Sequence, residues 1–272
     1  MTLRAVQPLD LPDVPRAEID PTLPEVRLVD PATLLVDDNY QRNLSDRSIR
    51  LIRKIVAEWS WLALKPPSVS EVDGQLHVVD GQHTAIGAVT HGGIPLIPVI
   101  VTKGRTQEER ASGFVRHNRD RIQVTPTQLH MAMVAAGDED ALTIAQVCAR
   151  AGVKILKNPP PFAKFKPGDT MAITTIAAMV NRRHAAGARK VLDVCVQGGA
   201  APVSAVLIRA VEHLLFSKEY KDEIEPSRIA TLLTAIPEQI ESEAKRFATE
   251  RKVPLWRATA SVIFMNRRKA RG

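Results

Sequence analysis

Between residues 76 and 101 the spacing of apolar residues changes from that of a strand to that of a helix and back again. Residues 76–79 form a short, mostly apolar run typical of a strand, residues 83–91 follow helical spacing, and residues 97–101 are again strand-like. Asp80-Gly81 marks a turn before the helix, and Gly92-Gly93 marks its end. The sequence therefore predicts a strand, helix, strand unit with a polar corner at Gly81.

The same reading predicts further elements on either side of this unit. Strands are predicted at 26–29 and 68–72, and helices at 46–59 and 106–117. Ser45 caps the first of these helices, and Thr106 with Glu109 forms a capping box for the second. The 46–59 helix carries a basic face, which is either simply solvated, the commoner case, or in contact with phosphates. That face consists of Arg47, Arg50, Arg53 and Lys54.

From Pro126 onwards the predicted elements are helices. They run from Pro126 to a stop at Gly137 and then cover 140–151, 170–186, 189–196, 203–216, 227–236, 238–249 and 255–269. The first two, joined by the tight turn at Gly137, are either a helix-turn-helix or ordinary helical packing. The sequence thus predicts an α+β protein, with a small mixed-sheet domain followed by a mainly α-helical C-terminal region.

Proline and charge set the expected domain boundaries. Five prolines in the first 25 residues exclude a helix or central strand there. Three consecutive prolines in KNPPPFAKFKPGD indicate a linker. We therefore expect a disordered arm (1–25), a sheet domain (26–125), a helical extension (126–156), a Pro-rich linker (157–169) and a helical domain with a basic tail (170–272).

Composition limits the classes of function. The chain is 44% apolar and 25% charged, as in ordinary globular proteins, and contains neither an apolar run of spanning length nor a leader pattern, so we expect a cytoplasmic protein without membrane contact. Two isolated cysteines, Cys148 and Cys195, give no support for a disulfide framework or a metal site. A net charge of +7 points to an anionic partner, with DNA first.

The Gly81 corner has the chemistry of an anion site. A glycine permits the sharp turn, and the helix behind it presents unpaired backbone N–H groups and the positive end of its dipole. His83 lies in the first helical turn, so we expect it to be neutral or stabilised by an anion. The alternative is that Asp80 or Thr84 caps the helix and His83 is an ordinary surface residue.

Residues 26–128 resemble the ParB N-terminal-like domain of the ParB/sulfiredoxin superfamily. Three blocks match in order: Tyr40-Gln41-Arg42, the segment VVDGQHTAIGAVTHGGIPLIPVIV that contains the corner, and HNRDRIQVTPTQ. The spelling Asp-Gly-Gln-His also looks like that of DGQHR-type proteins of DNA modification and restriction systems. The resemblance implies a mixed α/β domain that binds DNA or a nucleotide triphosphate; in ParB proteins this is CTP with magnesium, which closes a clamp on DNA.

The resemblance also implies a set of ligand-binding residues. Phosphate or ligand contacts are expected from Gln41, Arg42, Gly81, Gln82, His83, Thr84, Asn118, Arg119 and Arg121. The chain departs from the family pattern where Gln82-His83-Thr84 replaces Glu-Arg-Arg and where His117 replaces an acidic residue, which weakens triphosphate and magnesium binding. Gln82 also stands where sulfiredoxin needs a cysteine, which excludes that activity.

Three hypotheses for function follow. The first is a ParB-like DNA-associated protein, of the kind found in phages and plasmids, that binds DNA or a nucleotide through the corner and uses its helical region for DNA or for forming a homodimer. The second is a nuclease or NTPase in which His83 acts as a general base or as an electrophile towards phosphate, and Asp80 orients His83 or holds a metal ion. The third is a non-catalytic interaction scaffold that has lost its ligand.

Overall fold

The computed structural model describes residues 5–41, 44–120, 123–220 and 222–268. The chain divides into two compact units, Met1–Ile122 and Gln123–Gly272, which are described separately below. The first unit contains a four-stranded mixed sheet and three α-helices, and the second is mainly helical. The predicted α+β class, with a mixed-sheet domain followed by a helical region, is therefore confirmed.

In the sheet of the first unit, the strand that leads into the predicted corner at Gly81 lies at an edge. Its strands are β1 (Glu25–Val29), β2 (Ser68–Val72), β3 (Gln75–Asp80) and β4 (Ile97–Thr102). Their order is β1-β4-β2-β3; β4 pairs with β2 in parallel, and the other two pairings are antiparallel. The hairpin from β2 to β3 turns at Asp73-Gly74, with positive φ at both residues.

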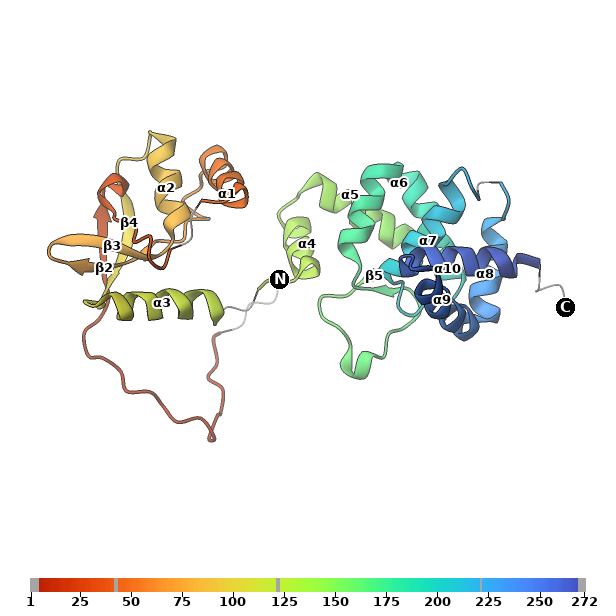
Figure 1. Ribbon diagram of the computed structural model, residues 1–272, viewed down its shortest axis with the longest axis horizontal. Coiled ribbons are helices and arrows are strands. Elements are labelled where there is room, and N and C mark those ends of the chain that lie inside the picture. Colours follow the sequence, from red (N-terminus) through yellow and green to blue (C-terminus); the bar gives the residue numbers. More distant parts are fainter. Residues whose placement is uncertain (1–4, 42–43, 121–122, 221, 269–272) are drawn as a thin grey trace. The chain divides into compact units, whose positions relative to one another are not determined.

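Three helices cover the two faces of this sheet. They are α1 (Asp46–Ala57), α2 (Gln82–His91) and α3 (Gln107–Arg119). Figure 1 shows α1 and α2 over one face and α3 beneath the other. Adjacent residues of β3 serve both faces, because successive side chains of a strand point in opposite directions: Val78 belongs to the apolar core that includes Ala88 of α2, whereas Val79 lies against Gly113 of α3.

Close approach between α1 and α2 depends on a glycine. A Cβ added to Gly87 would lie 2.6 Å from Cγ2 of Ile55, so the two helices pack more closely than a side chain at this position would allow. The two predicted caps are present: the Ser45 hydroxyl accepts from the Ser48 N–H, and Thr106 forms a capping box with Glu109. The Ser45 cap and the close contact with Gly87 thus fix the position of α1, the helix with the predicted basic face.

The segment before α1 runs along the outer edge of β3. Leu35 donates its N–H to Leu76 O (2.9 Å) and accepts from Val78 N–H (2.8 Å), which adds one bridge to the edge strand. The described part of the N-terminal arm, residues 5–24, forms neither helix nor strand and is exposed. One of its carboxylates, Asp20, accepts two hydrogen bonds from Lys103 Nζ at 2.9 Å.

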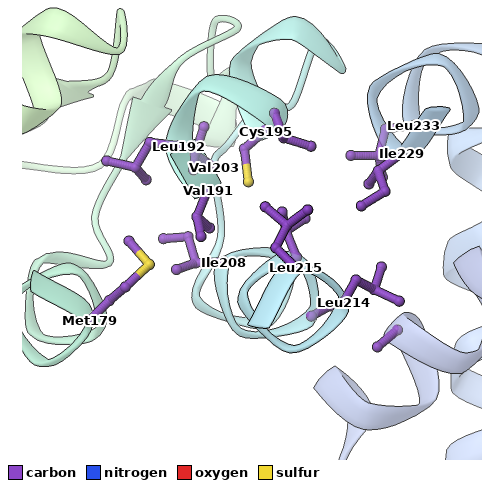
Figure 2. Packing of buried hydrophobic residues seen from close by; sticks show 14 of the residues in the cluster. Met179, Val191, Leu192, Cys195, Val203, Ile208, Leu214, Leu215, Ile229 and Leu233 are labelled. Carbon is purple, nitrogen blue, oxygen red and sulfur yellow. The ribbon is translucent and has the colours of Figure 1, made fainter. Parts of the chain in front are cut away.

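The described residues of the second unit form seven helices, and all but the first contribute buried side chains to one apolar core. They are α4 (Pro126–Ala135), α5 (Glu139–Arg150), α6 (Ile173–Gln197), α7 (Ala205–Phe216), α8 (Pro226–Ala235), α9 (Pro237–Arg251) and α10 (Leu255–Met265). Figure 2 shows how Leu192 and Cys195 of α6 meet Ile208 and Leu215 of α7 in this core. The apolar sides of α5 to α10 form this interior.

Two parts of this unit bear on the sequence prediction. Residues 170–186 and 189–196 were expected to form separate helices; α6 spans both, but its backbone is not helical at His184 (φ 56°, ψ 176°), so two helical segments meet at a kink close to the predicted break. The segment 157–169, expected to link two domains, is a loop inside the second unit between β5 (Lys154–Ile155) and β6 (Asp169–Thr170). The reason is that α5 contributes Ile144 and Val147 to the same core as α6, so the chain does not leave the unit there.

At its C-terminal end the described chain finishes soon after α10. A 3₁₀ turn, Asn266–Arg268, follows the helix, and Lys269 and Arg271 of the predicted basic tail lie outside the described residues. Within the part of the chain that the structure describes, no helix has the length and apolar character needed to cross a bilayer.

Candidate functional site

The corner between β3 and α2 requires a glycine for two separate reasons. Gly81 has φ 95° and ψ 17°, in the left-handed region. A Cβ at this position would also lie only 2.8 Å from Cα of Pro67. Backbone conformation and lack of space therefore both select glycine, and α2 begins directly behind it.

The N-terminus of α2 carries no side-chain cap. Gly81 occupies the N-cap position, and no side chain accepts a hydrogen bond there, so the alternative in which Asp80 or Thr84 caps the helix is not observed. The N–H groups of Thr84 and Ala85 donate to Gly81 O at 3.0 and 3.1 Å. The amides of Gln82 and His83 precede them in the first turn, where the helix dipole is positive.

Gln41 and Tyr40 fix the preceding loop to the end of β3. Gln41 Nε2 donates to the carbonyls of both Val78 and Val79 at 3.1 Å, and Tyr40 Oη donates to Val78 O at the same distance. Burial raises the pKa of Tyr40, which keeps this hydroxyl protonated. Both amide hydrogens of Gln41 are thus used within the protein, and it keeps only its carbonyl oxygen for other contacts.

These elements surround a cleft of about 240 Å³. Seven of the residues predicted from the sequence line it: Gln41, Asp80, Gly81, Gln82, His83, Thr84 and Asn118. Gln82 is buried, with 9% of its surface exposed, whereas His83 and Thr84 are half-buried. Residues from three separate parts of the sequence thus meet in one place.

The far side of the cleft is formed by the end of α3. Asp80 Oδ2 lies 3.9 Å from Nδ1 of His117, so an imidazole of α3 lies beside a carboxylate that lines the cleft. Asn118 lines the cleft and donates from Nδ2 to Phe114 O at 2.9 Å, within its own helix. One hydrogen of this amide and its oxygen therefore remain for a ligand.

Among the described residues that line the cleft there is no predicted arginine. Arg42 and Arg121 lie outside the described residues. Arg119 is exposed, is not among the residues that line the cleft, and donates to Asp120 with Nε–Oδ1 of 2.7 Å. This ion pair raises the pKa of Arg119 and lowers that of Asp120. Arg119 is therefore engaged with its neighbour in this structure.

Lys65 lines the cleft and was missed by the sequence analysis. It directly precedes Pro66-Pro67 in the sequence. Lys65 reaches the cleft because its neighbour Pro67 packs against Gly81, and no local sequence pattern indicates this contact. Lys65 brings a positive charge to the cleft.

The described residues fit a phosphate group better than a bound divalent metal ion. Across the described chain there is no group of three or more His, Cys, Asp and Glu side chains that could hold a metal. Asp80 is the one carboxylate among the residues that line the cleft. Magnesium is usually bound through carboxylates, whereas an uncapped helix N-terminus with a nearby lysine suits a phosphate.

Comparison with known proteins finds a match to a protein family and a similarity to a solved structure. The model of a family of unknown function, DUF6551, matches residues 36–265. Among solved structures, the C-terminally truncated chromosome-partitioning protein ParB from Caulobacter crescentus, complexed with CTP-gamma-S, is similar at 13% identity and a TM-score of 0.36, over 79% of this chain and 98% of that one. No curated protein sequence matches the chain. Because the family match covers the cleft and most of the helical unit together, the chain belongs to the DUF6551 family.

Proposed function

We propose that the protein binds DNA and that the cleft at the Gly81 corner holds a phosphate group of the DNA backbone. The observation that carries this proposal is the N-terminus of α2, which has no side-chain cap and lies in the wall of the cleft. Backbone amides and the positive end of a helix dipole form a ready anion site, and phosphate is one of the anions that such sites bind.

Positive side chains around the cleft support the same ligand. Leu51 and Ile55 of α1 form part of the cleft wall. Arg47 and Lys54 lie one turn before and one turn after Leu51, so they share its side of the helix. Together with Lys65 and the net charge of +7, they create a positive field that attracts a polyanion.

A nucleotide is the second ligand to consider, because the similar ParB structure was solved with CTP-gamma-S. Its phosphates would use the same amides. The cleft, at about 240 Å³, is smaller than the roughly 300–1,000 Å³ of most small-molecule pockets. We therefore place a single backbone phosphate first. A nuclease is not pursued, because metal-assisted cleavage usually needs several carboxylates and Asp80 alone lines the cleft among the described residues.

The test introduces a negative charge into the corner without removing the fold. In His83→Asp the new carboxylate lies in the first turn of α2, where it satisfies the amides and stabilises the helix by about 0.3–1 kcal/mol. The same carboxylate repels phosphate. Because hydrogen bonds to charged groups contribute about 1.5–3 kcal/mol, we expect duplex DNA to bind roughly 10-fold to 150-fold more weakly.

The matched control is His91→Asp, which makes the same exchange at the other end of α2, on the exposed surface. Binding of a fluorescent 30-base-pair duplex is measured by anisotropy at several salt concentrations. Equal binding by wild type and His83→Asp, or an equal loss in His91→Asp, contradicts the proposal. Titration calorimetry of the same proteins with CTP, ATP and GTP plus magnesium identifies a nucleotide if binding is detected and then lost in His83→Asp.

A further inference from the structure

The loop between β5 and β6 projects from the second unit on a fixed base. Lys154 N–H donates to Gly168 O at 2.9 Å, and Leu156 N–H donates to Thr170 O at 2.9 Å. Gly168 N–H in turn donates to Ala200 O at 3.0 Å. The loop is visible in Figure 1 as the long green connection next to β5. Its two ends are therefore held by the body of the unit, and its tip extends away from the core.

Helix α4 holds the first arm of this loop. Thr127 Oγ1 donates to Lys157 O at 3.3 Å, and Gln128 Nε2 donates to Asn158 Oδ1 at 3.0 Å. Residues 159–161, which follow, are three prolines, whose φ angles are restricted by their rings. These contacts and the prolines lower the conformational entropy that the loop loses when it binds a partner.

The tip presents an aromatic ring to solvent. Phe162 is 93% exposed, and its backbone has φ 55°; Ala163 follows with φ 52°. Left-handed backbone at two consecutive residues with side chains is uncommon and carries a cost in conformational energy. The ring contributes nothing to the apolar core, so its position is not explained by the stability of the unit.

The loop that carries this ring is rich in positive charge. Residues 154–168 contain four lysines and no aspartate or glutamate. All four are exposed: Lys154, Lys157, Lys164 and Lys166. The carboxylate that follows the loop, Asp169, is buried and accepts from the Lys166 backbone N–H at 2.8 Å, so it is turned towards the base of the loop. The tip therefore combines one aromatic face with several cations.

We propose that this loop binds single-stranded nucleic acid, with Phe162 stacking on a base while Lys164 and Lys166 contact phosphates. Single-stranded nucleic acid is recognised by this combination of aromatic stacking and positive charge. A protein partner would need an apolar patch of several hundred Å², and one exposed ring is too small, but it is sufficient for one base. This inference does not rest on the proposed function, because it concerns another unit, another ligand form and other residues.

The experiment measures binding of the full chain to fluorescent 20-residue oligothymidylate and oligouridylate by anisotropy. Stacking of one base corresponds to a loss of about 5-fold to 150-fold in affinity when the ring is removed, which we expect for Phe162→Ala. Phe162→Leu keeps an apolar side chain without an aromatic face and should lose nearly as much, whereas Phe162→Trp should bind at least as tightly as wild type. Removing both Lys164 and Lys166 should reduce the slope of log affinity against log salt by about 1.4.

A control removes an exposed apolar side chain elsewhere. Leu62 is 99% exposed in the first unit, and Leu62→Ala should bind both oligonucleotides as wild type does. Binding of oligothymidylate, oligouridylate or both that depends on the ring supports the proposal and shows which of the two polymers is preferred. Absence of binding to both, unchanged affinity in Phe162→Ala, or full affinity in Phe162→Leu would overturn it.

Discussion

Replacing Gly81 with alanine should lower the stability of the first unit for two reasons, one in the backbone conformation and one in the packing. The left-handed backbone at Gly81 (φ 95°) costs a non-glycine residue about 1–2 kcal/mol. The added Cβ, 2.8 Å from Cα of Pro67, has a second cost because the neighbour is backbone and cannot rotate away. Overpacking of this kind costs about 1–3 kcal/mol, so we expect the first unit to lose about 2–5 kcal/mol of its free energy of unfolding.

Gly74 is the matched control for this substitution. It lies in the β2–β3 turn of the same unit with φ 77°, but a Cβ there meets nothing within 4 Å. Gly74→Ala should therefore show the backbone cost alone, about 1–2 kcal/mol. The difference between the two variants, about 1–3 kcal/mol, measures the steric contact with Pro67.

Hydrogen exchange is the suitable assay, because it reports on one unit of a two-unit chain. The Val78 N–H, bonded to Leu35 O, exchanges when the edge of the first unit opens, and amides of the second unit provide an internal reference. Equal losses of protection at Val78 in the two variants would refute the steric argument. A loss of amide protection in the second unit would show that the effect does not come from the corner at Gly81.

Three further predictions concern other parts of the chain. Glu212 is buried, which alone would raise its pKa, but the hydrogen bonds from Arg182 and Arg183 lower the pKa overall. The stability that this group contributes is therefore present above its ordinary pKa and is lost as the pH falls through the lowered pKa. Glu212→Gln should lower the free energy of unfolding by about 1–3 kcal/mol at pH 7 in urea unfolding, with a smaller difference in acid. If the difference grows as pH falls, the sign is wrong. Gly87→Ala should be destabilising alone but less so in Ile55→Ala, since that change removes the Cγ2 atom in its way; additive effects in a double-mutant cycle would contradict the contact. Burial raises the pKa of both Cys148 and Cys195 to about 12, so a thiol reagent at pH 8 should modify neither until the protein is unfolded; rapid labelling of the native protein would disprove this.

The corner could be predicted from the sequence because its determinants are local. Gly81 follows an apolar run and precedes helical spacing, and these signals lie within a few residues of one another. The family resemblance predicted that His83 and Asn118 share a site, the enzyme hypothesis added Asp80, and all three line the cleft. Their role in binding stays a prediction.

Features that depend on contacts between distant residues could not be predicted. Lys65 reaches the cleft because Pro67 packs on Gly81, and no periodicity carries this information. The amide hydrogens of Gln41 are used by β3 carbonyls, which only the folded arrangement shows. Likewise, β5 and β6 are two residues long, too short for a hydrophobic pattern, so the loop between them looked like a linker.

The bridge that Leu35 makes along β3 has a consequence for solubility. An edge strand with free backbone groups is a template on which another chain can add a strand, and proteins commonly cover such edges. Here Leu35 occupies the backbone groups of Leu76 and Val78, while Tyr40 and Gln41 occupy the carbonyls at the end of the strand. The segment that builds one wall of the cleft thus also shields the sheet from self-association. A substitution that releases this segment would open the edge as well as the cleft, and the first sign of the change would be aggregation at high protein concentration.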